Sequence, residues 1–228
     1  MIDFFKGKLK KIDKAILKSF VNLPYDKYEK SKGYYFRFRR FSKFYIINDS
    51  ISFISDTKFF QAKQLNRYAG GLKRKFLPIE DKIKFKMVEL FKNNFLGTLN
   101  NKKKMEIGLH QLRIKCGKNF VGYPVPEGWH KDGFNFVILI NFGSKNITGG
   151  VTRIKEKLND NKDTFSSFLE KGEFIFTKEQ NPFDKRCSHD ITSKHDVYSK
   201  NKETGTDIPK YHFGNNTNGT PYIHLNDY

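Results

Sequence analysis

Length, composition and charge exclude several classes of protein. The chain has 228 residues, of which 37% are hydrophobic and 16% aromatic. It can therefore bury a core, and disorder over most of its length is excluded. No segment reaches the ~20 consecutive apolar residues of a membrane span, and the N-terminus does not resemble a secretory signal. Two cysteines, Cys116 and Cys187, are too few for a disulfide framework, so we expect a soluble cytoplasmic protein.

The net charge of +19 raises the question of nucleic-acid binding. It is made of 35 Lys and only 8 Arg, whereas phosphates and bases are recognised best by the planar guanidinium of Arg. We therefore interpret most of the charge as a lysine-rich coat. Binding to nucleic acid stays open as a minority alternative.

The N-terminal part predicts two helices and a group of strands. Apolar residues at steps of three and four predict an amphipathic helix over residues 2–20, followed by a linker to residue 32. Alternating aromatic and basic residues in 34–55 predict strands, although an aromatic–basic strand can also stack nucleic-acid bases. A second apolar stripe predicts a helix from Ile79 to about Gly97.

From about residue 105 the chain predicts short strands with no long helix between them. The expected strands are 105–116, 119–123, 134–142, 147–155, 173–177, 186–192 and 221–225. The polar segment 193–220 predicts a long loop. This pattern favours a fold that is mainly β with flanking helices, a single domain with an antiparallel barrel or jelly-roll core from about 105 to 228. The N-terminal helices are expected to pack outside that core.

A His-x-Asp motif, His130 and Asp132, precedes a strongly apolar strand. Residues i and i+2 of an extended segment face the same side, so both can bind one metal ion. Together with His189 they offer two imidazoles and one carboxylate, the facial triad of non-haem Fe(II) oxygenases. A surface histidine near a turn aspartate gives the same short pattern. The other histidines that compete for the third position are His195, His212 and His224, whereas His110 is expected to be structural or to line a pocket.

Beyond this motif, the sequence from about residue 33 onward resembles the bacterial 2-oxoglutarate/Fe(II) dioxygenases of the L-isoleucine hydroxylase type. The segments that carry the resemblance are 37–41, Gln61 with 64–66, 70–76, 110–114, 126–133, 146–150 and 189–192. The resemblance implies a double-stranded β-helix (jelly-roll, cupin-like) core. It implies Fe(II) held by His130, Asp132 and His189, with 2-oxoglutarate and O2 as cosubstrates. A small molecule, most plausibly a free L-amino acid, is the expected substrate to be hydroxylated.

One departure concerns the residue that binds the far carboxylate of 2-oxoglutarate. The family usually places an Arg after the distal histidine, but this chain has no Arg after Arg186. Arg153 is an alternative cation, although an outward-facing strand charge is an equal interpretation. Tyr123 and Tyr222 offer hydroxyl groups to the same cosubstrate.

Four further residues are predicted around a substrate pocket. Arg113, Arg74 and Asn66 resemble family positions there, with salt bridges and turn hydrogen bonds as the alternative interpretation. Trp129, next to His130 and near Asp132 in the sequence, can form a wall of the site or cap a core.

Two alternative functions stay open at this stage. The same oxygenase chemistry can act on an acidic macromolecule, either nucleic acid or protein. The chain can also be a non-catalytic metal-binding barrel that has lost its 2-oxoglutarate anchor.

Overall fold

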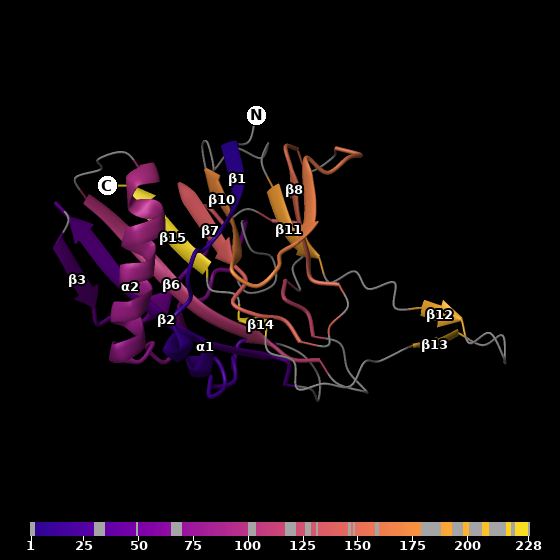
Figure 1. The fold of residues 1–228 in the computed structure, drawn as a ribbon, viewed down its shortest axis with the longest axis horizontal. Helices are drawn as coiled ribbons and strands as arrows, with labels where there is room; N and C mark the ends of the chain where they lie inside the picture. Colours follow the sequence, from indigo (N-terminus) through magenta and orange to yellow (C-terminus); the bar gives the residue numbers. More distant parts are fainter. Residues whose placement is uncertain are drawn as a thin grey trace.

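A large antiparallel sheet forms the centre of the molecule (Figure 1). The computed structural model describes residues 3–29, 35–48, 50–64, 70–99, 104–116, 122–125, 129–130, 132–145, 147, 149–157 and 160–178, and the backbone of the strands that follow. In spatial order the large sheet contains β1 (Asp3–Lys8), β10 (Glu173–Lys178), β7 (Phe136–Ile140), β15 (Tyr222–Asp227), β6 (Lys104–Ile114), β2 (Arg37–Ile47) and β3 (Ser50–Ile54), and β14 (Asn218–Gly219) pairs with β6.

A smaller sheet packs against one face of the large one. It contains β11 (Ser188–Thr192), β8 (Val151–Lys155) and β9 (Phe165–Phe168), in that order. The apolar side chains between the two sheets come from the large sheet, from the small sheet and from the adjoining loops: Leu139 and Ile175, Ile154, and Val125 and Leu169, respectively. The chain alternates between the sheets, since β7 and β10 belong to the large sheet and β8, β9 and β11 to the small one. The predicted mainly β fold with few helices is confirmed.

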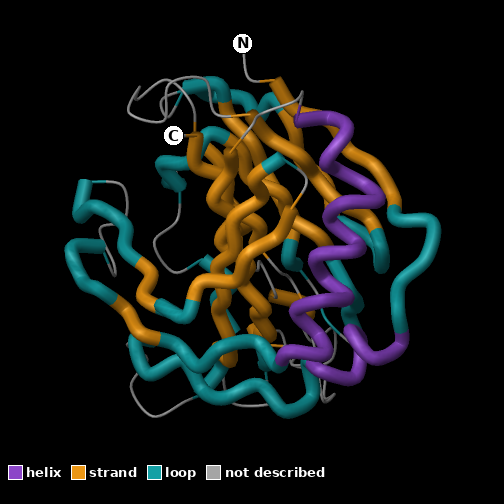
Figure 2. Tube along the Cα trace, turned by 90° about the vertical axis from the view of Figure 1, so that its left-hand side faces the viewer, coloured by secondary structure: helices purple, strands orange, loops and turns teal. Residues whose placement is uncertain are grey.

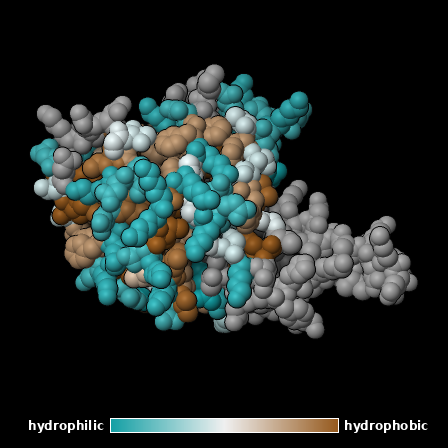
Figure 3. All heavy atoms as spheres, in the orientation of Figure 1, coloured by the Kyte–Doolittle hydropathy of each residue, from teal (hydrophilic) through white to brown (hydrophobic). Residues whose placement is uncertain are grey.

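Helices cover the opposite face of the large sheet (Figure 2). They are α1 (Lys14–Ser19), α2 (Asp81–Phe95) and the 3-10 turn η1 (Leu96–Leu99). The buried positions of α2 follow the predicted apolar stripe and include Ile83, Met87 and Phe91, which join Ile107 and Leu109 of β6 in one core. Hydrophilic residues dominate this side of the molecule (Figure 3). Neither helix in the described part of the chain is long and apolar enough to cross a membrane.

The predicted helix over residues 2–20 is wrong in its first half. Residues 3–8 form the edge strand β1, in which Gly7 lies opposite Phe174 of β10. A Cβ atom at Gly7 would collide with the Phe174 ring, so the sheet needs glycine there. The helix α1 begins only after Asp13, whose carboxylate caps it by accepting from the Ala15 amide at 2.6 Å.

Other predicted elements agree with the structure to different degrees. Six of the predicted strands correspond to β6, β7, β8, β10, β11 and β15. The predicted loop 193–220 is wrong in part, because it includes β14 and the paired strands β12 (Tyr198–Lys200) and β13 (Asp207–Pro209). The predicted strand 119–123 lies mostly outside the described residues. Sequence periodicity missed β9 and the two-residue strands β4 (Lys58–Phe59) and β5 (Arg74–Lys75).

Candidate metal centre

The structure brings His130 and Asp132 together on the segment that leads into β7. The Nε2 of His130 lies 3.5 Å from the Oδ1 of Asp132, and the two side chains are 7% and 6% exposed. Two donor atoms that each lie about 2.1 Å from a common ion are at most about 4.2 Å apart. An imidazole nitrogen and a carboxylate oxygen are also donors that suit Fe(II). The pair therefore fits such an ion.

The third predicted ligand, His189, lies on β11. Its Cα is paired with that of Ile154 in β8, and Ile154 is buried between the two sheets. The side chain of His189 is outside the described residues. Among the side chains that the structure does describe, no group of three His, Cys, Asp or Glu forms a metal cluster. His189 as a ligand therefore stays a prediction.

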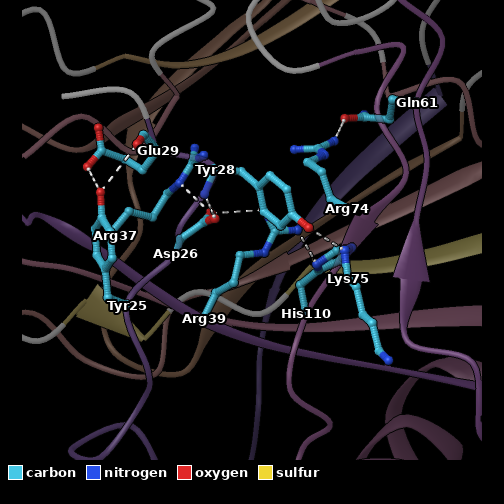
Figure 4. A network of polar contacts seen from close by, with 10 residues as sticks. All are labelled: Tyr25, Asp26, Tyr28, Glu29, Arg37, Arg39, Gln61, Arg74, Lys75 and His110. Carbon is cyan, nitrogen blue, oxygen red and sulfur yellow. Dashed lines mark hydrogen bonds and ion pairs between the residues drawn. The ribbon is translucent and has the colours of Figure 1, made fainter.

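A short clip of chain reaches Asp132 from another part of the sequence. We call β4, β5 and the described residues between them, up to 64 and from 70, the β4–β5 clip. Gln61 of this clip is buried, and its Nε2 donates to the Oδ1 of Asp132 at 3.2 Å. Arg74, also buried, donates from Nη2 to the Oε1 of Gln61 at 2.9 Å (Figure 4). The predicted pocket residue Arg74 is thus connected to Asp132 through Gln61.

A second polar cluster lies on the inner face of β2 and β6. The buried carboxylate of Asp26 lies 3.0 Å from Arg37 Nε and 3.6 Å from Arg39 Nη1. Arg39 Nη2 lies 2.6 Å from the Nδ1 of His110 (Figure 4). A guanidinium only donates, so Nδ1 accepts and the neutral imidazole carries its proton on Nε2. His110 is therefore a buried interior residue, as expected.

Burial of this cluster bears on the nucleic-acid alternative. Arg37 and Arg39 are 5% and 8% exposed, so the aromatic–basic strand cannot present them to a macromolecule. Arg40 points to the other side, where it donates to the carbonyl of Pro78. The arginines that suggested base stacking are mainly interior residues.

Aromatic rings connect the two polar clusters. His110 stacks on Phe41 with ring centroids 4.2 Å apart and meets the edge of Phe59 at 4.6 Å. Phe59 stacks in turn on Phe134, which follows Asp132 by two residues. The guanidinium of Arg74 lies 4.8 Å from the Phe59 ring centre, a cation–π distance. Apolar rings thus enclose the charged groups and strengthen their electrostatic interactions.

Arg113 lies away from the metal pair, on the helix-covered face of β6. Its Nη1 donates to the carbonyl oxygens of Phe20 and Val21, the first at 3.0 Å. Burial lowers the pKa of the guanidinium, and the Phe38 ring packs against it. The structure therefore gives Arg113 a role at the end of α1.

Arg153 and Trp129 contact each other at the small sheet. The Arg153 guanidinium lies 4.9 Å from the Trp129 ring centre and 3.6 Å from the Asp163 carboxylate. Lys155, two residues along β8, also lies over Trp129. Because Ile154 faces the space between the sheets, its neighbours in the strand face the other side. These contacts do not support Arg153 as the anchor for 2-oxoglutarate.

The structure describes the side chain of only one of the remaining predicted residues, Tyr123. Tyr123 is 44% exposed and meets the ring of Phe36 edge-on. Only the backbone of Tyr222 is described, paired with Leu139 of β7. Asn66 lies outside the described residues.

Gln61 is the residue of this site whose contact the sequence did not predict. It is separated from Asp132 by 71 residues, and no spacing rule connects two such distant positions. The resemblance of the segment around Gln61 to the dioxygenases was the one signal available.

Comparisons with known proteins identify the family of the chain. A model of the 2OG-Fe dioxygenase family matches residues 17–206. Over 127 residues the chain is 31% identical to the L-isoleucine-4-hydroxylase of Bacillus thuringiensis, an alignment that covers 50% of this chain and 52% of that enzyme. The chain thus spans about half the length of this curated relative.

Two solved structures share the fold. A BsmA homologue of Methylobium petroleophilum PM1 gives a TM-score of 0.67 at 19% identity, covering 94% of this chain and 80% of its own. IDO from Bacillus thuringiensis gives a TM-score of 0.63 at 18% identity, and the match covers 98% of this chain and 90% of IDO. The family match spans most of the chain. The chain therefore belongs to the 2OG-Fe dioxygenase family, whose enzymes use Fe(II), 2-oxoglutarate and O2.

Proposed function

We propose that this chain is an Fe(II)- and 2-oxoglutarate-dependent hydroxylase of a small molecule, with a free L-amino acid as the substrate class. The observation that carries the proposal is the buried pair of His130 and Asp132, 3.5 Å apart, in a chain of this family. The name of the matched relative, an L-isoleucine-4-hydroxylase, supports the amino-acid substrate.

We further infer that the core is a double-stranded β-helix. The alternation of β7, β8, β9, β10, β11 and β15 between two facing antiparallel sheets supports this topology. In such a core the segment of His130 and the strand of His189 reach the same space from different directions. Trp129, the neighbour of His130, contacts Arg153 of β8, and β8 is paired with β11, which supports the nearness of the two segments.

In this proposal His130, Asp132 and His189 hold the metal. Fe(II), when bound, supplies the activation of O2 that is coupled to the decarboxylation of 2-oxoglutarate. Asp132 contributes one negative charge in a site where burial strengthens its attraction to a cation. The rings of Phe59 and Phe134 stack on each other beside this segment, and the Asp132 side chain is 6% exposed.

The proposal is tested by turnover of the reconstituted protein. Anaerobic loading with Fe(II), followed by O2, 2-oxoglutarate and a panel of L-amino acids, should yield succinate with at least one of them. Asp132→Ala should abolish succinate formation and stoichiometric Fe(II) binding. The matched control Asp160→Asn changes an acid that accepts from the Lys157 amide and should leave both unchanged.

Different results would support different alternatives. Metal binding without succinate for every amino acid would favour a non-catalytic metal-binding barrel. Unchanged Fe(II) binding by both Asp132→Ala and His130→Ala would overturn the metal assignment itself.

A further inference from the structure

We propose that Gln61 and Arg74 are positioning residues for Asp132. In this relay, Arg74 fixes the side-chain amide of Gln61, and that amide holds the carboxylate of Asp132 in one orientation. The inference rests on the proposed function, because it assumes that Asp132 binds the metal. It adds Gln61 and Arg74 of the β4–β5 clip to the residues that shape the site.

The chemistry of the three groups permits one direction of hydrogen bonding. Arg74 carries only donors, so the atom of Gln61 that faces it at 2.9 Å must be the acceptor Oε1. The NH2 group of Gln61 is then left to face Asp132, whose ionised carboxylate only accepts. The 3.2 Å contact from Nε2 to Oδ1 has this polarity. Arg74 therefore decides which end of Gln61 meets the proposed ligand.

The clip gives the relay an ordered and well-packed base. The Cα atoms of Phe59 and Arg74 are paired between β4 and β5, and the Arg74 guanidinium lies over the Phe59 ring. The Gly71 amide donates to the carbonyl of Gln61 at 2.8 Å, which ties the main chain on both sides of the clip. Gln61 and Arg74 are 6% and 2% exposed, so their rotamers are restricted by packing. The carboxylate thus meets a donor that is already in place.

The order of the three groups, guanidinium, amide and carboxylate, suits a carboxylate that binds a metal ion. A cation bonded directly to Asp132 would compete with the metal for the same negative charge. The neutral amide of Gln61 donates a hydrogen bond without adding a charge. The positive charge of Arg74 lies one residue further and strengthens that bond by polarising the amide. Outer partners of this kind orient ligands, and their loss typically costs 10–100-fold in metal affinity.

The test measures binding of Co(II), a spectroscopic probe for the Fe(II) site, to the full chain. Gln61→Met should raise the dissociation constant for Co(II) by about 10–100-fold and change the visible absorption spectrum of the bound ion. Arg74→Met should act in the same direction with a smaller effect, because it leaves the Gln61 side chain in place. Arg74→Lys, which keeps a charged donor, should recover part of the affinity. Far-UV circular dichroism verifies that each variant is folded.

The helix-covered face of β6 offers matched controls. Gln111 is a buried glutamine whose Nε2 donates to the Ser19 hydroxyl, and Arg113 is a buried arginine bonded to carbonyl groups. Gln111→Met and Arg113→Met remove the same chemical groups from similarly buried positions. Both should leave the dissociation constant and the spectrum of bound Co(II) unchanged.

The outcomes separate the relay from the function on which it rests. If His130→Ala and Asp132→Ala bind Co(II) as well as the natural protein, the metal assignment fails. If these two lose binding while Gln61→Met stays within twofold of the natural protein, the relay alone is overturned. Should Gln61→Met fail to fold, Gln61→Asn serves instead, because its amide is too short to reach both partners and should weaken binding in the same way.

Discussion

The two faces of the β2–β6 pair bury charge in different ways. The helix-covered face is largely apolar, and its buried cation, Arg113, donates to main-chain carbonyls next to α1. The inner face holds Arg37, Arg39 and His110, which are bonded to side chains. Beside that face, the clip connects Arg74 to Asp132 through Gln61. A buried cation that meets only the main chain stabilises the fold, whereas one that meets a succession of side chains can also orient a functional group.

The largest expected loss of stability comes from replacing Asp26, which lies beside the inner face. Its carboxylate is fully buried between Arg37 and Arg39. Asp26→Asn leaves two buried guanidinium groups without that charge and should lower the free energy of unfolding by about 3–5 kcal/mol, measured by urea denaturation. Glu106→Gln, which removes an ion pair of partly exposed side chains with Lys43, should cost less than about 1 kcal/mol. Equal effects of the two variants would contradict the difference we draw.

A smaller loss of stability is expected from replacing Arg113 on the helix-covered face. Arg113→Met keeps the side chain long and apolar but leaves the carbonyls of Phe20 and Val21 without this donor. The free energy of unfolding should fall by about 1–3 kcal/mol, because unsatisfied buried acceptors are costly. Urea denaturation with Co(II) and without it should give the same difference from the natural protein. A destabilisation that depends on Co(II) would show that this face is also coupled to the site.

The smallest effect concerns a partly exposed ion pair outside both faces. Lys6 of β1 bonds to Glu173 of β10 at 2.8 Å, and this hydrogen bond, with that from the Glu170 amide, lowers the pKa of Glu173 below its usual value of 4.5. Its contribution to stability is therefore complete above about pH 4.5 and is lost as the pH falls through the lower folded pKa. Glu173→Gln should remove this part of the pH dependence of thermal unfolding, at a cost of less than about 1 kcal/mol. If thermal unfolding of Glu173→Gln depends on acidic pH as it does in the natural protein, this ion pair is not the source of that dependence.

Sequence reasoning succeeded where the information lies within one segment. The stripe of α2 and the strand β6 follow from apolar spacing along a single element. The His130–Asp132 pair follows from the two-residue period of extended chain. In each case the relevant neighbours are close in sequence, so a periodicity is sufficient to predict them.

It failed where a distant segment decides the structure. The apolar spacing of residues 2–20 favoured a helix, but β1 forms because β10 accepts it as an edge strand and Gly7 fits against Phe174. The aromatic–basic alternation of β2 left base stacking open, yet Phe59 of the clip and Asp26 contact its buried arginines. Gln61 meets Asp132 only through the tertiary position of the clip. None of these contacts leaves a periodic signal.

The β4–β5 clip has a consequence for how the site opens. Its two strands are joined by two residue pairs, Lys58 with Lys75 and Phe59 with Arg74, and a two-stranded ribbon is at best marginally stable by itself. We therefore expect the clip to open locally more often than the helix-covered core, although its side chains are well packed when it is closed. Because the clip contacts Asp132, metal binding and clip closure stabilise each other by the same free energy. Loading the site with metal should therefore slow amide hydrogen exchange in residues 58–64 and 70–75 while leaving the helix-covered core unchanged.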